Sequence, residues 1–248
     1  MMIRVTPATA QELKELRSEH FIVRYPSDID EDVARSLKSL GEDYYRRISQ
    51  EFNLIRDKLW VWDNRAKIYV ARDKAEYVKR YNCPEWSAAC VNAGDKAIYT
   101  YPHQRNFPSI MAHELTHIIF REYVGQGRLP LWLDESIAVY MEDKLNGGVK
   151  VHLSKIRAAI ENNTYIPFSQ LGQVAGLNGA KQDYIDLFYV ESFSIMSFLL
   201  DRFGRSNFSQ FLFALRNGST LDAALAKGFV SIHNTAELEQ QWKRFYQE

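Results

Sequence analysis

The segment His113-Glu114-Leu115-Thr116-His117 holds the residues best suited to chemistry. On a helix, two histidines four positions apart lie on one face, with Cβ atoms roughly 5–6 Å apart. Two such imidazoles can share one zinc ion, each reaching it at about 2.0–2.1 Å. Glu114 stands beside the first histidine, where it can contact a water on the metal without being a ligand. The spacing predicts a catalytic zinc site, and its alternative is a pair of buried histidines with ordinary hydrogen-bond partners.

The flanking residues predict the helix that this spacing requires. Asn106 and Pro108 suit its start, and Gly125 and Gly127 suit its end. Apolar residues recur between them at three- and four-residue spacing: Ile110, Met111, Leu115, Ile118, Ile119 and Tyr123. The two histidines therefore interrupt an otherwise apolar helix.

A second predicted helix offers a third ligand. It begins near Pro130 with the run PLWLDESIAVYME, and glycines before it allow the chain to turn back. Glu135 in this run can face the two imidazoles. Two histidines and one carboxylate leave the fourth zinc position open, as a catalytic site requires. The alternative for Glu135 is a surface acid in the first turn of a helix.

The segments HELTH and WLDESIAVYME together resemble the gluzincin zinc peptidases, and most closely the peptidase MA-like metallohydrolases, relatives of the aminopeptidase-N and thermolysin groups. The resemblance implies a zincin-like fold that binds one Zn²⁺ per chain through His113, His117 and Glu135. It implies that Glu114 is the general base. Ser136 replaces a glycine usual in these groups, and the gap between the second histidine and the glutamate is one residue shorter than in the aminopeptidase-N group. Both departures concern subfamily and remove no ligand.

The same resemblance points to a catalytic tyrosine. In the aminopeptidase-N group, a tyrosine at the start of a later helix donates a hydrogen bond to the oxyanion of the tetrahedral intermediate. Tyr189 matches that position, although the Lys-Gly pair that accompanies it in the group is absent here. Tyr184 is the rival candidate. The alternative for Tyr189 is an aromatic side chain that only packs against a neighbouring helix.

Glu142 is a candidate for supporting the ligands from outside. It follows Glu135 by seven residues, two helical turns, and so lies on the same face. From there its carboxylate can accept the free ring N–H of a ligand histidine, which fixes the tautomer and raises the basicity of the ring. The alternative is a solvated acid paired with a nearby basic residue.

The remaining pattern predicts an α+β fold. Strands are expected at 20–25 and 66–70, with a hairpin of 88–91 and 96–101, and helices at 30–52, 73–81, 154–162, 181–203, 207–216, 220–226 and 235–247. We expect a single catalytic domain, 1–248, with the HExxH helix between two lobes. A small mixed β-sheet lobe would cover about 18–124, and a helical lobe about 125–248.

Composition excludes several classes of protein. Acidic and basic residues balance at 31 each, which argues against nucleic-acid binding. No apolar run approaches the roughly eighteen residues of a transmembrane segment. The start lacks a signal segment, so we expect export or lipid anchoring if a leader was removed, and otherwise a cytoplasmic location. The oligomeric state stays open.

Cys83 and Cys90 are close enough in sequence to form a local disulfide. They could equally be two small buried side chains. Free thiols are slightly favoured, because spacing alone does not show that the Cβ atoms meet.

These residues predict a zinc metallopeptidase acting on a peptide or protein substrate. Zinc would activate a water, Glu114 would take its proton, and Tyr189 would stabilise the oxyanion. An edge strand of the predicted hairpin would pair with an extended substrate. Because the amine-recognition segment of the aminopeptidase-N group is absent, cleavage inside a chain is favoured. The alternatives are a zinc-binding interaction module with little turnover, which would not need Glu114, and a metallohydrolase of non-peptide amides or esters.

Overall fold

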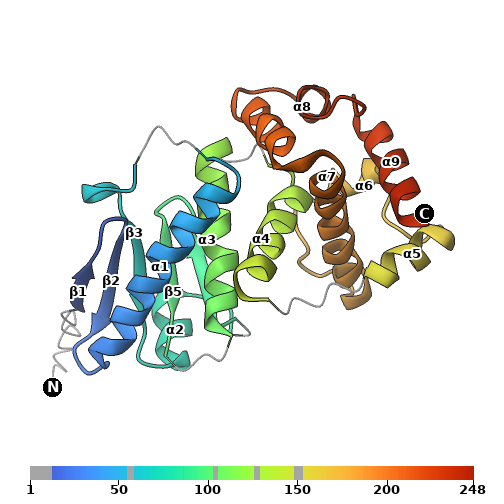
Figure 1. Ribbon diagram of the computed structural model, residues 1–248. Helices are drawn as coiled ribbons and strands as arrows, with labels where there is room; N and C mark the ends of the chain where they lie inside the picture. Colours follow the sequence, from blue (N-terminus) through green and yellow to red (C-terminus); the bar gives the residue numbers. More distant parts are fainter. Residues whose placement is uncertain (1–12, 55–58, 86, 103–105, 126–128, 148–152) are drawn as a thin grey trace, which may run out of the picture. The chain divides into compact units, whose positions relative to one another are not determined.

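The computed structural model describes residues 13–54, 59–85, 87–102, 106–125, 129–147 and 153–248. Its contacts divide the chain into two units, 1–42 with 60–105 and 43–59 with 106–248. The described strands all lie in the first unit, and most of the helices lie in the second (Figure 1). The predicted α+β fold class is confirmed. The second division between the units falls near residue 105, whereas the sequence predicted a lobe boundary near residue 125. The HExxH helix belongs to the second unit because it packs on the helices that follow it.

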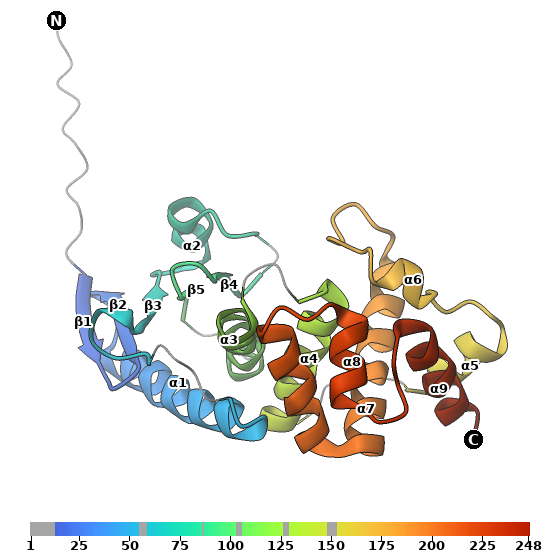
Figure 2. The ribbon, with the colours of Figure 1, turned by 90° about the horizontal axis from the view of Figure 1, so that it is seen from above.

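The first unit is built on a five-stranded mixed sheet with the order β1-β2-β3-β5-β4. The parallel pairs are β2 with β3 and β3 with β5, and the outer pairs are antiparallel. The strands are β1 (Leu13–Arg17), β2 (Phe21–Pro26), β3 (Ala66–Val70), β4 (Ala89–Asn92) and β5 (Ala97–Thr100). Figure 2 shows α1 (Glu31–Glu51) and α2 (Lys74–Tyr81) on opposite sides of this sheet.

Strand β1 was not predicted from the sequence. It reads Leu-Lys-Glu-Leu-Arg, and this charged run gives little of the alternation that marks a strand. Glu15 accepts hydrogen bonds from Arg17 and from Arg24 of β2, both at 2.8 Å. Such charged side chains are typical of an edge strand, where they discourage pairing with other chains. The short helices Trp62–Asn64 and α6 (Phe168–Leu171) were also missed.

Cys83 and Cys90 form a disulfide, with their Cα atoms 5.9 Å apart. The expectation of free thiols is therefore wrong. Cys83 follows α2, which ends with Asn82 in the left-handed conformation, and Cys90 lies in β4. The turn after α2 and the pairing of β4 with β5 bring the two cysteines together. Their separation in the sequence predicts neither the turn nor the pairing.

The second unit is helical. It contains the last part of α1 and the helices α3 (Phe107–Val124), α4 (Leu131–Asn146), α5 (Leu153–Glu161), α6, α7 (Gln182–Arg216), α8 (Leu221–Gly228) and α9 (Thr235–Gln247). Helix α4 lies between α3 and α7 (Figure 1). In the part of the chain that the structure describes, none of the helices has the length and apolarity needed to cross a lipid bilayer.

Two features of α3 and α7 follow the sequence closely. Helix α3 starts after Asn106 with Pro108 in its first turn, and Gly125 ends it at a positive φ of 101°. Gly127 lies outside the described residues. Helix α7 is interrupted at Gly204, whose φ of 79° and ψ of 168° are not helical. It therefore consists of two helices, as the ranges 181–203 and 207–216 predicted.

A continuous apolar core joins α3, α4 and α7. Its side chains have no exposed surface: Met111, Leu115 and Ile119 of α3, Leu133 and Ile137 of α4, and Ile195 and Leu199 of α7. Close packing of such side chains fixes both the rotation and the height of each helix. The polar residues between them are therefore held in a defined arrangement.

Candidate metal centre

Helix α3 carries His113 and His117 one turn apart. Their Nε2 atoms are 3.1 Å from each other, and the ring planes are inclined by 79°. His117 is buried, and the side chain of His113 is 20% exposed. The two rings thus direct one nitrogen each to the same place, as the four-residue spacing predicted.

Helix α4 brings Glu135 to the same place. Its Oε2 atom is 3.5 Å from His113 Nε2 and 3.7 Å from His117 Nε2. The potential ligand atoms of these residues all lie within 4.8 Å of one another. The core around Leu133 and Ile137 holds this turn of α4 against α3.

The donor atoms fit a tetrahedral metal ion. Ligands at about 2.0–2.1 Å from a tetrahedral centre are roughly 3.3 Å apart, and the three observed separations bracket that value. Glu135 Oε2 is buried, and among the described residues it has no hydrogen-bond donor. A buried carboxylate oxygen without a partner is costly. A cation held by the two histidines and Glu135 would remove that cost.

Glu114 directly follows His113 in α3 and is partly buried beside the cluster. Burial raises the pKa of its carboxyl group, while the two histidines lower that pKa and Glu135 raises it further. Because it interacts with all three residues of the cluster without being one of them, Glu114 is placed to exchange protons with a molecule bound there.

Tyr189 of α7 lies next to Glu135. Burial raises the pKa of its hydroxyl strongly, and the charge of Glu135 and a hydrogen bond to that carboxylate raise it further. The side chain of Tyr184, the rival candidate, is 37% exposed. The structure thus brings Tyr189 into contact with a residue of the cluster.

Glu142 contacts the first histidine from outside. Its Oε2 atom is 3.2 Å from His113 Nδ1, the ring nitrogen that does not face the cluster. The contact predicted from helical periodicity is therefore confirmed. Burial lowers the pKa of His113, but the side chains of Glu135 and Glu142 outweigh it and raise that pKa to about 10.

Asp134 contacts the second histidine, His117, as Glu142 contacts the first. It was not among the predicted site residues. Its Oδ1 atom is 3.1 Å from His117 Nδ1, at ion-pair distance but off the axis of a good hydrogen bond. Arg121 donates from Nε and Nη2 to the other oxygen, Oδ2, at 2.8 and 2.5 Å. An arginine four residues after His117 and an aspartate directly before Glu135 were the available signals.

The charges of this cluster also favour a cation. Four carboxyl side chains interact with two imidazoles: Glu114, Asp134, Glu135 and Glu142. Burial raises the pKa values of Asp134 and Glu135, but the histidines, and for Asp134 also Arg121, outweigh it, so both are held below the usual range. Four carboxyl side chains outnumber the two imidazoles, and a divalent ion that took the place of the ring protons facing the cluster would balance this negative charge.

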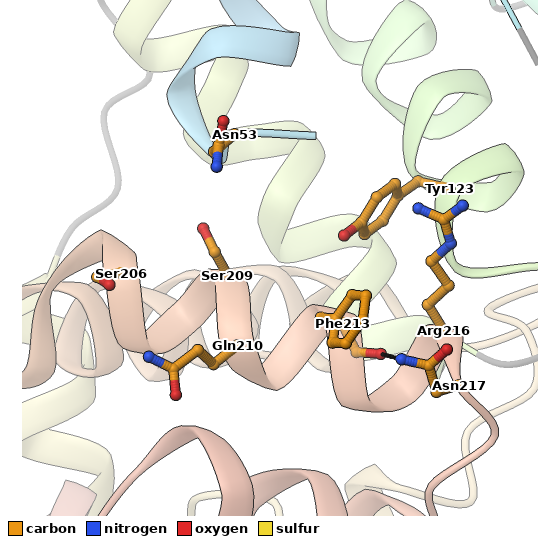
Figure 3. Close-up of a pocket in the computed structure, with 8 residues that line it drawn as sticks. All are labelled: Asn53, Tyr123, Ser206, Ser209, Gln210, Phe213, Arg216 and Asn217. Atoms are coloured by element: carbon orange, nitrogen blue, oxygen red, sulfur yellow. Dashed lines mark hydrogen bonds between the residues drawn. The ribbon is translucent and has the colours of Figure 1, made fainter. Parts of the chain in front are cut away.

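A separate pocket of about 630 Å³ lies in the same unit, over residues 206–216 of α7 and the following Asn217. Figure 3 shows the side chains around it, with Arg216 beside Tyr123; its guanidinium carbon is 4.7 Å from the ring centroid. None of the predicted site residues, all of which the structure describes, lines this pocket. It is therefore distinct from the candidate metal centre.

Comparison with known families agrees with this geometry. Residues 105–248, more than half of the chain, match the family model of the peptidase MA superfamily. The match includes all residues of the cluster and leaves out the sheet of the first unit. No curated protein sequence matches the chain significantly. The superfamily indicates a function of the metallopeptidase type, and its members are generally metal-dependent. The chain belongs to the peptidase MA superfamily.

Proposed function

We propose that this protein is a zinc-dependent metallopeptidase that hydrolyses peptide bonds within protein or peptide chains. The observation that carries the proposal is the convergence of His113 Nε2, His117 Nε2 and Glu135 Oε2, with Glu114 beside them. We further propose that the whole chain acts as a single catalytic domain.

The donor set supports zinc and a catalytic role for it. Two histidines and one carboxylate would hold the ion and leave a position open, whereas structural zinc sites are closed and usually contain cysteine. Both cysteines of this chain are joined in a disulfide in the other unit. When bound, zinc supplies Lewis acidity and lowers the pKa of a coordinated water toward about 7.

Glu114 has the chemistry of the general base. Its carboxylate would accept the proton of the attacking water and then pass it to the leaving amine. Tyr189 would act as a donor, because its raised pKa keeps the hydroxyl protonated at neutral pH. A hydroxyl aimed at the developing oxyanion stabilises the transition state more than the substrate.

A peptide substrate is supported by the sheet of the first unit. Strand β4 is an outer strand and, among the described residues, pairs with β5 alone. An extended peptide can add to such an edge through backbone hydrogen bonds, which provide affinity without a fixed sequence. Together with the missing amine-recognition segment, this favours an endopeptidase.

Casein, an unstructured protein, is the most direct substrate to test. We expect the purified protein to cut it into internal fragments, a chelator to abolish cleavage, and added zinc to restore it. Mass spectrometry of the products distinguishes internal cuts from stepwise trimming. A protein that binds zinc but cleaves neither casein nor a peptide library would support the interaction-module alternative. Cleavage of small amides or esters alone would support the non-peptide hydrolase.

Changing Glu142 to Gln tests the support of the first histidine. The amide is a weaker acceptor for the His113 Nδ1–H group than the carboxylate, so we expect zinc affinity to fall roughly 10–100-fold with the number of ligands unchanged. Asp143→Asn makes the same charge change at the next residue of α4 and should bind zinc like the wild type. Equal affinities for all three proteins, measured by chelator competition, would show that the contact has no effect on the metal.

A further inference from the structure

We infer that Arg121 is a positioning residue of the metal centre, which holds the carboxylate of Asp134 against His117 and so orients that ligand from outside. The inference rests on the proposed function, because it assigns a role to a residue beyond the ligands and the base. It concerns three side chains that join α3 to α4.

The contacts of Asp134 are divided between its two oxygens. Arg121 donates to Oδ2 through both Nε and Nη2, at 2.8 and 2.5 Å. The other oxygen, Oδ1, is left for the imidazole of His117, 3.1 Å away. A guanidinium with two N–H groups on one oxygen limits rotation of the carboxylate. Arg121 therefore holds the carboxylate in the orientation in which its second oxygen faces the histidine.

Burial makes Asp134 depend on this partner. Its side chain is only 5% exposed, so water cannot replace the charge of the guanidinium. By contrast, the side chain of Glu142, which faces the first histidine, is 24% exposed and remains partly solvated. A buried carboxylate that loses its counter-charge is no longer held in place and can rotate or move toward solvent. Such a movement would withdraw the acceptor from His117.

The orientation of the His117 ring matters because each of its two nitrogens must face a different group. Nε2 faces His113 and Glu135, and Nδ1 faces Asp134. A carboxylate at ion-pair distance from Nδ1 favours the tautomer that carries its proton there, which leaves the lone pair of Nε2 free for a metal. The side chain of His117 is 6% exposed, so solvent does not supply another acceptor.

The test compares Arg121→Met and Arg121→Lys with the control Arg205→Met. Arg205 also pairs with a buried carboxylate of this unit, because its Nε lies 2.9 Å from Glu51 Oε1, but Glu51 has no part in the metal centre. Zinc affinity is measured by chelator competition. The visible spectrum of the cobalt-substituted proteins reports ligand geometry, and thermal unfolding of the metal-free proteins reports stability.

We expect Arg121→Met to weaken zinc binding roughly 10–100-fold and to change the cobalt spectrum, as losses outside the ligand set typically do. Arg121→Lys, which keeps the charge but not the planar fork, should lie between this variant and the wild type. Arg205→Met should bind zinc normally even where its melting temperature falls. Wild-type zinc affinity and spectrum in Arg121→Met, or an equal loss of affinity in Arg205→Met, would overturn the inference.

A double-mutant cycle separates positioning from general damage, including the case in which Arg121→Met folds poorly. Asp134→Asn is neutral and needs no counter-charge, so adding Arg121→Met to it should cause little further loss of zinc affinity. Fully additive losses would contradict the inference while leaving the proposed function intact. A wild-type protein that binds no zinc at all would refute both.

Discussion

The variant Glu114→Gln should keep its zinc and its fold and lose nearly all hydrolysis. Glutamine has almost the shape of glutamate, and Glu114 is not a member of the three-residue ligand cluster. The glutamine amide cannot take a proton from water at neutral pH, however, and general-base catalysis typically contributes about 10²–10⁴-fold to the rate. We therefore expect kcat on a peptide substrate to fall by about that factor, with the zinc content unchanged.

Glu161→Gln is the matched control for this experiment, because it makes the same change at an exposed position of α5. It should cleave like the wild type. Turnover by Glu114→Gln at the rate of the wild type would exclude the general-base role. If that variant had also lost zinc, its inactivity would say nothing about proton transfer, so metal analysis must accompany the kinetics.

The cluster of potential metal ligands could be predicted from the sequence because most of it depends on helical periodicity alone. The four-residue spacing of His113 and His117 places both rings on one face, and the two turns from Glu135 to Glu142 do the same on α4. Only the packing of α4 against α3, which brings Glu135 to the histidines, could not be derived from periodicity. The resemblance to the gluzincins implied that packing.

Asp134 escaped prediction because its role depends on the exact contact of two helices. Within α4 alone it is an acid in the first turn, where the helix dipole already explains a negative charge. Its partners, Arg121 and His117, both lie on α3, and the dipole of that helix is enough to explain a basic residue such as Arg121 in its last turn. The position of each residue in its own helix thus explains its charge, and nothing in either helix alone indicates that Asp134 and Arg121 meet.

Two errors in the first unit have a similar origin. A strand is recognised by side chains that alternate between core and solvent, but β1 is an outer strand whose charged residues pair with each other and with Arg24. The disulfide depends on how the chain turns after α2, and sequence separation does not measure that distance. Both features are determined by tertiary pairing and not by local pattern.

Replacing His117 with Ala should remove the metal. Wild-type protein should contain about one zinc ion per chain, and the variant close to none after dialysis against a weak chelator. The loss of a ligand should exceed the roughly 10–100-fold cost of changing a residue that only supports one. Two donors, His113 and Glu135, remain, and they no longer surround the ion.

His233→Ala is the control, because the side chain of His233 is 63% exposed and forms a local ion pair with Glu237 of α9. It should retain both zinc and activity. The Asp134–Arg121 ion pair is still present in His117→Ala, so the packing of α3 against α4 should survive, which circular dichroism and thermal unfolding can verify. Equal zinc content in the wild type and in folded His117→Ala would refute the ligand assignment, and with it the zinc-dependent mechanism.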